Sequence, residues 1–124
     1  MKRIIAVIIL SVFVLSSYFI GISYIKSSCE KANDLLAKCT EIYKSDNDAT
    51  AASNELSKFW TKTEPYLSIF ANHAQIDEIE LAISSLQNYS NSKDNTIFYE
   101  YSGTVKTLLH QMLEDNTPSF HSIF

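Results

Sequence analysis

Glycine and proline are scarce in this chain, which has two of each in 124 residues. Folds built from β-strands and tight turns use these residues heavily, so their scarcity favours helices joined by short polar breaks. Glycine-rich phosphate loops are missing, and so are the His-Glu-x-x-His and Gly-x-Ser-x-Gly motifs. The sequence therefore predicts an all-α protein, and we expect it not to be an enzyme.

Basic charge is also in short supply. Lys2 and Arg3 lie at the very start, so the rest of the chain carries eight lysines against fourteen acidic residues, a net charge of −6. Nucleic acids and anionic membrane faces are bound by clustered basic residues. We therefore expect no nucleic-acid partner.

The chain has only two cysteines, Cys29 and Cys39. On one helix they lie about 15 Å apart along the axis, whereas a disulfide needs Cα atoms within about 7 Å. An intramolecular bond on that helix is excluded. Burial of both as small apolar side chains is the favoured interpretation, and an intermolecular bridge is the alternative.

One long apolar run is present. Ile4 to Ile25 forms 22 residues without a charge, between Lys2-Arg3 and Lys26. As a helix it is about 33 Å long, enough for a hydrocarbon core of about 30 Å. We predict an uncleaved transmembrane anchor over residues 1–25, with a cleaved signal peptide as the alternative, because the run exceeds the usual apolar length of a signal.

The flanking charges also predict an orientation. The basic start favours a cytoplasmic N-terminus with the following domain outside the cytoplasm, in a single-pass protein of the cell membrane. Within the run, Ser17 and Gly21 form a small-xxx-small pair that could admit a second membrane helix. The alternative is that these residues are merely tolerated in the anchor.

The remaining sequence predicts four amphipathic helices. The first continues from the anchor to near Ser45, the second starts near Asp48, Asn72 caps the third, and the fourth covers about residues 94–115. Pro65 predicts either a kink in the second helix or a new helical turn. Gly103, in the middle of the fourth, predicts a close helix crossing.

Apolar residues recur at steps of three and four in each helix, as in a bundle. Those residues are Cys29, Ala32, Leu36, Cys39 and Tyr43; Ala52, Leu56, Phe59, Trp60 and Thr63; Ile76, Ile79, Ile83 and Leu86; and Phe98, Tyr101, Val105, Leu108 and Met112. We predict two antiparallel hairpins over residues 26–116, followed by an apolar C-terminal tail, 117–124.

One helix face carries His73, Asp77 and Glu80, at positions i, i+4 and i+7. An imidazole and two carboxylates could hold a divalent metal. Acidic residues near a helix N-terminus are, however, what the helix dipole favours, and no second cluster supplies further ligands. We therefore expect no bound metal and no cofactor.

Aromatic side chains offer another candidate site. Trp60 and Phe70 either face a ligand pocket or belong to the core. The tail is unusually apolar for a free terminus, because it contains Phe120, Ile123 and Phe124. This predicts that the tail is buried in a groove or inserted into a partner. The candidate interaction surface therefore comprises Trp60, Phe70, His73, Asp77, Glu80, Phe120, Ile123 and Phe124.

A family resemblance rests on the middle of the chain. The segments are Trp60-Thr61-Lys62-Thr63, Tyr66-Leu67-Ser68-Ile69-Phe70, His73 and Ile76-Asp77-x-Ile79-Glu80. With the basic start and the anchor, they resemble a bacterial family known as domain of unknown function 4363. Pro65 departs from the helix former more usual there. The resemblance implies a small membrane-anchored helical protein of Gram-positive, clostridia-like bacteria and hints at a membrane partner.

Taken together, these features predict a membrane-anchored, extracytoplasmic helical interaction module that docks on a membrane or envelope protein. A helical domain that binds a small molecule or peptide is the alternative. A cavity beside Trp60 would favour the alternative, whereas an apolar surface along one helix would favour docking.

Overall fold

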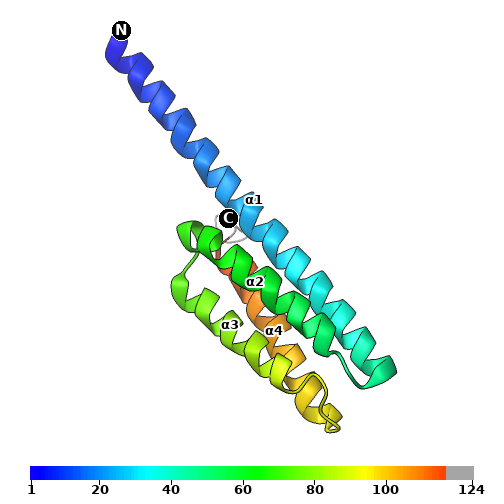
Figure 1. The fold of residues 1–124 in the computed structure, drawn as a ribbon. Helices are drawn as coiled ribbons and strands as arrows, with labels where there is room; N and C mark the ends of the chain where they lie inside the picture. Colours follow the sequence, from blue (N-terminus) through cyan, green and yellow to red (C-terminus); the bar gives the residue numbers. More distant parts are fainter. Residues whose placement is uncertain (117–124) are drawn as a thin grey trace.

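The computed structural model describes residues 1–116, which form four helices. These are α1 (Lys2–Asp46), α2 (Thr50–Phe70), α3 (His73–Asn88) and α4 (Asn95–Asn116), and residues 1–116 contain no strand. Each helix runs antiparallel to the next, and α1 packs against α2 and α4 while α3 packs against the same two helices from the opposite corner (Figure 1). The predicted all-α fold, a long apolar N-terminal helix followed by two hairpins, is confirmed.

Helix α1 is one continuous rod of 45 residues. It ends at Asn47, whose backbone is left-handed (φ 57°, ψ 17°) and whose N–H donates to the Tyr43 carbonyl. Asparagine tolerates this conformation better than most residues, so it is a suitable helix stop. The apolar N-terminal segment and the first bundle helix are therefore the single rod that the sequence predicts.

Helix α2 continues through Pro65 to Phe70. Its first turn follows Asp48, whose carboxylate accepts the Thr50 N–H at 3.0 Å. Pro65 is exposed, and Ala71 still donates its N–H to Leu67 at the end of the helix. Of the two interpretations of Pro65, the structure excludes a new helix start, because the proline lies inside one uninterrupted helix.

Side chains at the start of α3 join it to the end of α4. Asn72 caps α3 as predicted, because its Oδ1 accepts the Ala74 N–H at 2.8 Å. Gln75 does not complete a capping box; its amide donates to Asp115 at 2.7 Å and accepts from Asn116 at 2.9 Å. These bonds hold the α3 start and the α4 end at the same end of the bundle.

The core runs the length of the bundle. At the end distant from the N-terminus, Tyr43 stacks on Phe98 with ring centroids 3.7 Å apart, and its hydroxyl donates to the Ser92 carbonyl at 2.6 Å. Nearly all the predicted apolar positions are buried. In α4, Leu109 lies on the inward face and is fully buried, whereas the predicted core residue Leu108 is half-buried. Both cysteines are buried and free.

The two glycines have opposite environments. Gly21 is buried, and a Cβ built on it would lie 2.5 Å from Cδ1 of Phe70. Gly103 is exposed, and apart from the adjoining backbone of its own helix, no atom of the described residues lies within 4 Å of such a Cβ. The close crossing predicted at Gly103 is therefore wrong for this part of the chain, and the close approach occurs at Gly21 instead.

Candidate functional site

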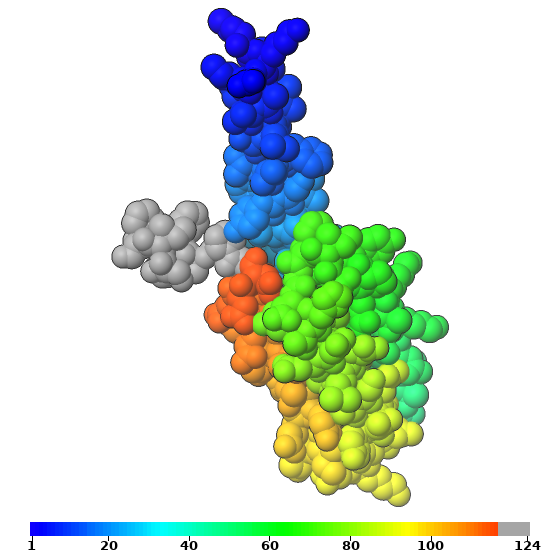
Figure 2. All heavy atoms as spheres, turned by 90° about the vertical axis from the view of Figure 1, so that its left-hand side faces the viewer, coloured from blue at the N-terminus to red at the C-terminus, as the bar shows by residue number. Residues whose placement is uncertain are grey.

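The N-terminal part of α1 extends beyond the bundle with its apolar side chains uncovered. Every residue from Met1 to Ile20 is exposed, and burial begins at Gly21. Figure 2 shows this segment, in blue, projecting from the packed helices. Among the described residues, α1 is the one helix long and apolar enough to cross a membrane. The bundle thus has a proximal end, where α1 enters it, and a distal end at Tyr43.

Exposed apolar side chains gather at the proximal end, near the end of α2. Tyr66 is 59% exposed, Ile69 is 71% exposed and Phe70 is 39% exposed. Tyr24 of α1 lies beside them, with ring centroids 6.3 Å from Tyr66 and 6.4 Å from Phe70. We name Tyr24, Tyr66, Ile69 and Phe70 the aromatic end patch.

A second feature is a carboxylate cluster between α2 and α3. Glu64 is half-buried, and its Oε1 has no hydrogen-bond partner among residues 1–116. Burial, then the Glu80 carboxyl group and then the Asp77 carboxylate raise the pKa of Glu64 from 4.5 to about 7. A proton on Glu64 at neutral pH lets it donate to Glu80, so the pair avoids two adjacent charges.

Glu64 is the member of this cluster that the sequence reasoning missed. The available signal was spacing, because Glu64 follows the buried Trp60 by four residues and so shares its helix face. Asp77 and Glu80, like His73, are exposed on α3. Within residues 1–116, no three histidine, cysteine or acidic side chains are arranged to hold a metal ion.

Trp60 lies in the core and not on the surface. Its side chain is 1% exposed, and its indole Nε1 donates to the Ile76 carbonyl at 3.4 Å. Of the two interpretations of this residue, burial supports the core one. Phe70, His73, Asp77 and Glu80 remain accessible, whereas Phe120, Ile123 and Phe124 lie outside the described residues.

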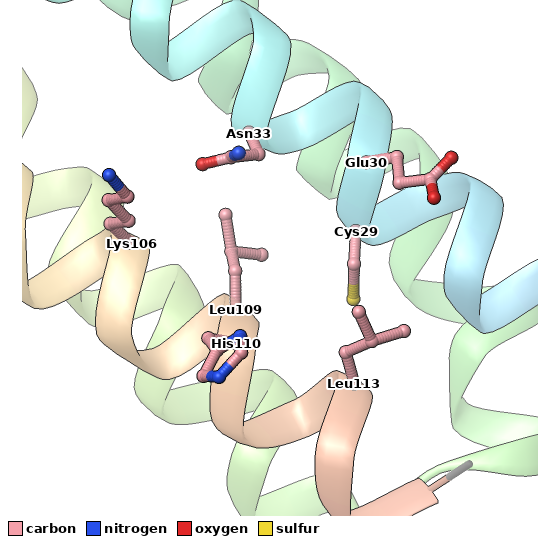
Figure 3. Close-up of a pocket in the computed structure, with 7 residues that line it drawn as sticks. All are labelled: Cys29, Glu30, Asn33, Lys106, Leu109, His110 and Leu113. Atoms are coloured by element: carbon pink, nitrogen blue, oxygen red, sulfur yellow. The ribbon is translucent and has the colours of Figure 1, made fainter.

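A small cavity lies between α1 and α4. It has a volume of about 150 Å³, and its lining residues are Cys29, Glu30, Asn33, Lys106, Leu109, His110 and Leu113. In Figure 3 the Cys29 thiol points toward Leu113, and the Glu30 carboxylate turns away from that contact. Ligand pockets are typically about 300–1,000 Å³, so this cavity suits at most a very small molecule.

The cavity places a thiol and an imidazole in one lining, although the thiol is not activated. Burial, helped by Glu30, raises the pKa of Cys29 from 9.0 to about 11. His110 is paired with Glu114, with 3.0 Å between Nε2 and Oε1. A nucleophilic cysteine needs a lowered pKa, so this site lacks the electrostatics of a Cys–His catalytic pair.

The fourth feature is an apolar groove between α3 and α4. Its lining comprises Glu78, Leu81, Ala82, Ser85, Tyr101, Thr104 and Leu108, and Leu81 at its edge is 70% exposed. The backbone of α1 makes no close approach to α3, so α1 does not cover the α3 side of this α3–α4 groove.

These features define a class of protein, a short antiparallel helical bundle carried on one long apolar helix. A family model described as a domain of unknown function, DUF4363, matches residues 19–123, and the chain belongs to this family. The resemblance inferred from the middle of the sequence is confirmed. The match covers the bundle and only the last part of the apolar run. No curated protein and no solved structure matches the chain.

Proposed function

We propose that this protein is a membrane-anchored interaction module whose helical bundle docks on a membrane or envelope protein. The observation that carries the proposal is the division of α1, in which residues 1–20 are exposed and the helix then enters a bundle. An uncovered apolar helix of this length is costly in water and stable in a bilayer. The cavity near Cys29 does not favour a ligand-binding function, because it is small and Trp60 is buried.

The flanking charges support an extracytoplasmic bundle. Lys2 and Arg3 lie at the N-terminal end of the apolar run, whereas Lys26 and Lys31 at its other end have Glu30 between them. Basic residues near a span are retained in the cytoplasm. We therefore place the N-terminus in the cytoplasm and the bundle outside it.

The α3–α4 groove is the surface that we assign to the partner protein. Leu81, Ala82 and Leu108 contribute apolar side chains to its lining, and Glu78 contributes a charged one. An apolar centre with a polar rim is the usual anatomy of a protein interface. An apolar surface along a helix is also the feature that distinguishes docking from binding of a small molecule.

Three measurements test the proposal. The full-length protein should stay in the membrane pellet after alkaline carbonate washing, and external protease should degrade the bundle in cells with a permeable wall. Release of a shortened soluble form would instead identify a cleaved signal, and protection from protease would reverse the orientation.

The partner is tested by affinity capture from detergent-solubilised native membranes. Leu81→Glu should abolish capture without lowering the melting temperature, because Leu81 is 70% exposed. Ala37→Glu, on an exposed position of α1, is the matched control and should capture normally. Equal capture by both variants would contradict the assignment of the groove.

A further inference from the structure

We propose that the aromatic end patch lies at the outer interface of the bilayer that α1 spans, where the headgroups meet the acyl chains, so that the bundle is seated on the lipid surface. This inference rests on the proposed anchor, and it assigns lipid as the ligand of Tyr24, Tyr66, Ile69 and Phe70. The evidence is the length of α1, the position of its first packing contact and the chemistry of the patch.

The apolar run leaves little freedom in how deeply the protein sits in the bilayer. Arg3 and Lys26 flank it, and charged side chains at both ends resist entry into hydrocarbon. The run rises about 33 Å against a hydrocarbon core of about 30 Å, a slack of about 3 Å. The outer hydrocarbon boundary therefore lies close to Tyr24 and Ile25.

The bundle begins before that boundary is reached. Gly21 lies about 6 Å along the helix axis before Ile25, and the Phe70 ring packs directly on it. Because α1 is continuous through this point, the end of α2 cannot be lifted away from the membrane by a flexible linker. A tilt of the anchor shortens its rise along the bilayer normal and moves Phe70 deeper.

The chemistry of the patch suits the interface between lipid and water. Tyrosine rings are enriched there because one edge is apolar and the hydroxyl stays hydrated, and Tyr24 and Tyr66 pack edge to face. Ile69 is one of the most exposed apolar residues of the bundle. The patch has no basic residue, so insertion is driven by apolar contact and requires no anionic lipid.

The test uses the full-length protein in phosphatidylcholine vesicles. Ile69→Cys and, as the matched control, Leu81→Cys introduce thiols at positions 71% and 70% exposed. Each is labelled with the environment-sensitive fluorophore NBD, and a nitroxide near the top of the lipid acyl chains serves as the quencher. The wild-type protein measures background labelling of the buried Cys29 and Cys39. Tyr66→Cys provides a second reporter in the patch.

The labels at positions 69 and 66 should emit at shorter wavelength and lose most of their emission to the lipid quencher, whereas the label at position 81 keeps its emission. Equal quenching at positions 69 and 81, with the protein resistant to carbonate extraction, would overturn the seating of the bundle and leave the anchor intact. If carbonate extracts the protein from the vesicles, the proposed membrane anchor is wrong, and this inference is wrong with it.

Discussion

Replacing Trp60 with alanine is the most direct test of the packing that holds the bundle together. The indole is 1% exposed at the contact between α2 and α3, and its Nε1 donates to the Ile76 carbonyl. Truncation removes the buried ring, leaves a cavity and removes the indole N–H that donates to the Ile76 carbonyl. Such truncations of buried tryptophan cost about 3–5 kcal/mol.

That loss is large for a bundle of this size, whose total stability is expected at about 5–14 kcal/mol. Each kcal/mol lowers the melting temperature by roughly 4–8 °C in a domain of this length, so Trp60→Ala should melt at least about 12 °C below wild type. Trp60→Phe keeps most of the packing and loses the hydrogen bond, so a smaller cost of about 1–2 kcal/mol is expected.

The measurement is urea unfolding of the full-length protein in detergent, followed by circular dichroism because Trp60→Ala removes the only tryptophan. Leu81→Ala, at an exposed position of α3, is the surface control and should change stability by no more than about 0.5 kcal/mol. A Trp60→Ala variant within about 1 kcal/mol of wild type would refute the core assignment, since a cavity of that size cannot be neutral.

Two further predictions concern titrating groups. Glu64 has a folded pKa of about 7 against an ordinary value of 4.5, so the folded state binds more protons between these values and stability should fall as pH rises from about 4.5 to 7. In urea unfolding at pH 5 and pH 8, Glu64→Gln should lose less stability than wild type, whereas Glu41→Gln, on the exposed face of α1, should lose as much. A stability difference between wild type and Glu64→Gln that is the same at both pH values would contradict the assignment. Cys29 and Cys39 both have pKa values raised to about 11 by burial, so N-ethylmaleimide at pH 7.5 should modify them slowly in the native protein and rapidly in urea. Fast modification of the native protein would show that the buried face of α1 becomes accessible in solution.

Helical periodicity was enough to predict the fold. Residues such as Leu36, Ile79 and Val105 recur at steps of three and four, and an apolar stripe on a helix must be covered in water. The same local reasoning found the continuous rod of α1 and the Asn72 cap, because both depend on residues close together in the chain.

Contacts between helices decided the features that helical periodicity left open. Pro65 is compatible with both a break and a continuous helix, and packing of the following turn, with Leu67 fully buried, favours continuity. Gly21 has the spacing for an intermolecular helix contact, yet its neighbour is Phe70 of the same chain. Both outcomes depend on which helix, distant in the sequence, packs against the residue.

The candidate sites divide in the same way. The sequence alone determined that Ile4 to Ile25 is long and apolar enough to span a bilayer, because length and composition are local properties. It left Trp60 open between core and surface, and it gave no sign that Glu64 meets Glu80. Burial and the pKa of a carboxyl group depend on neighbours that only the packing of α2 against α3 brings within reach.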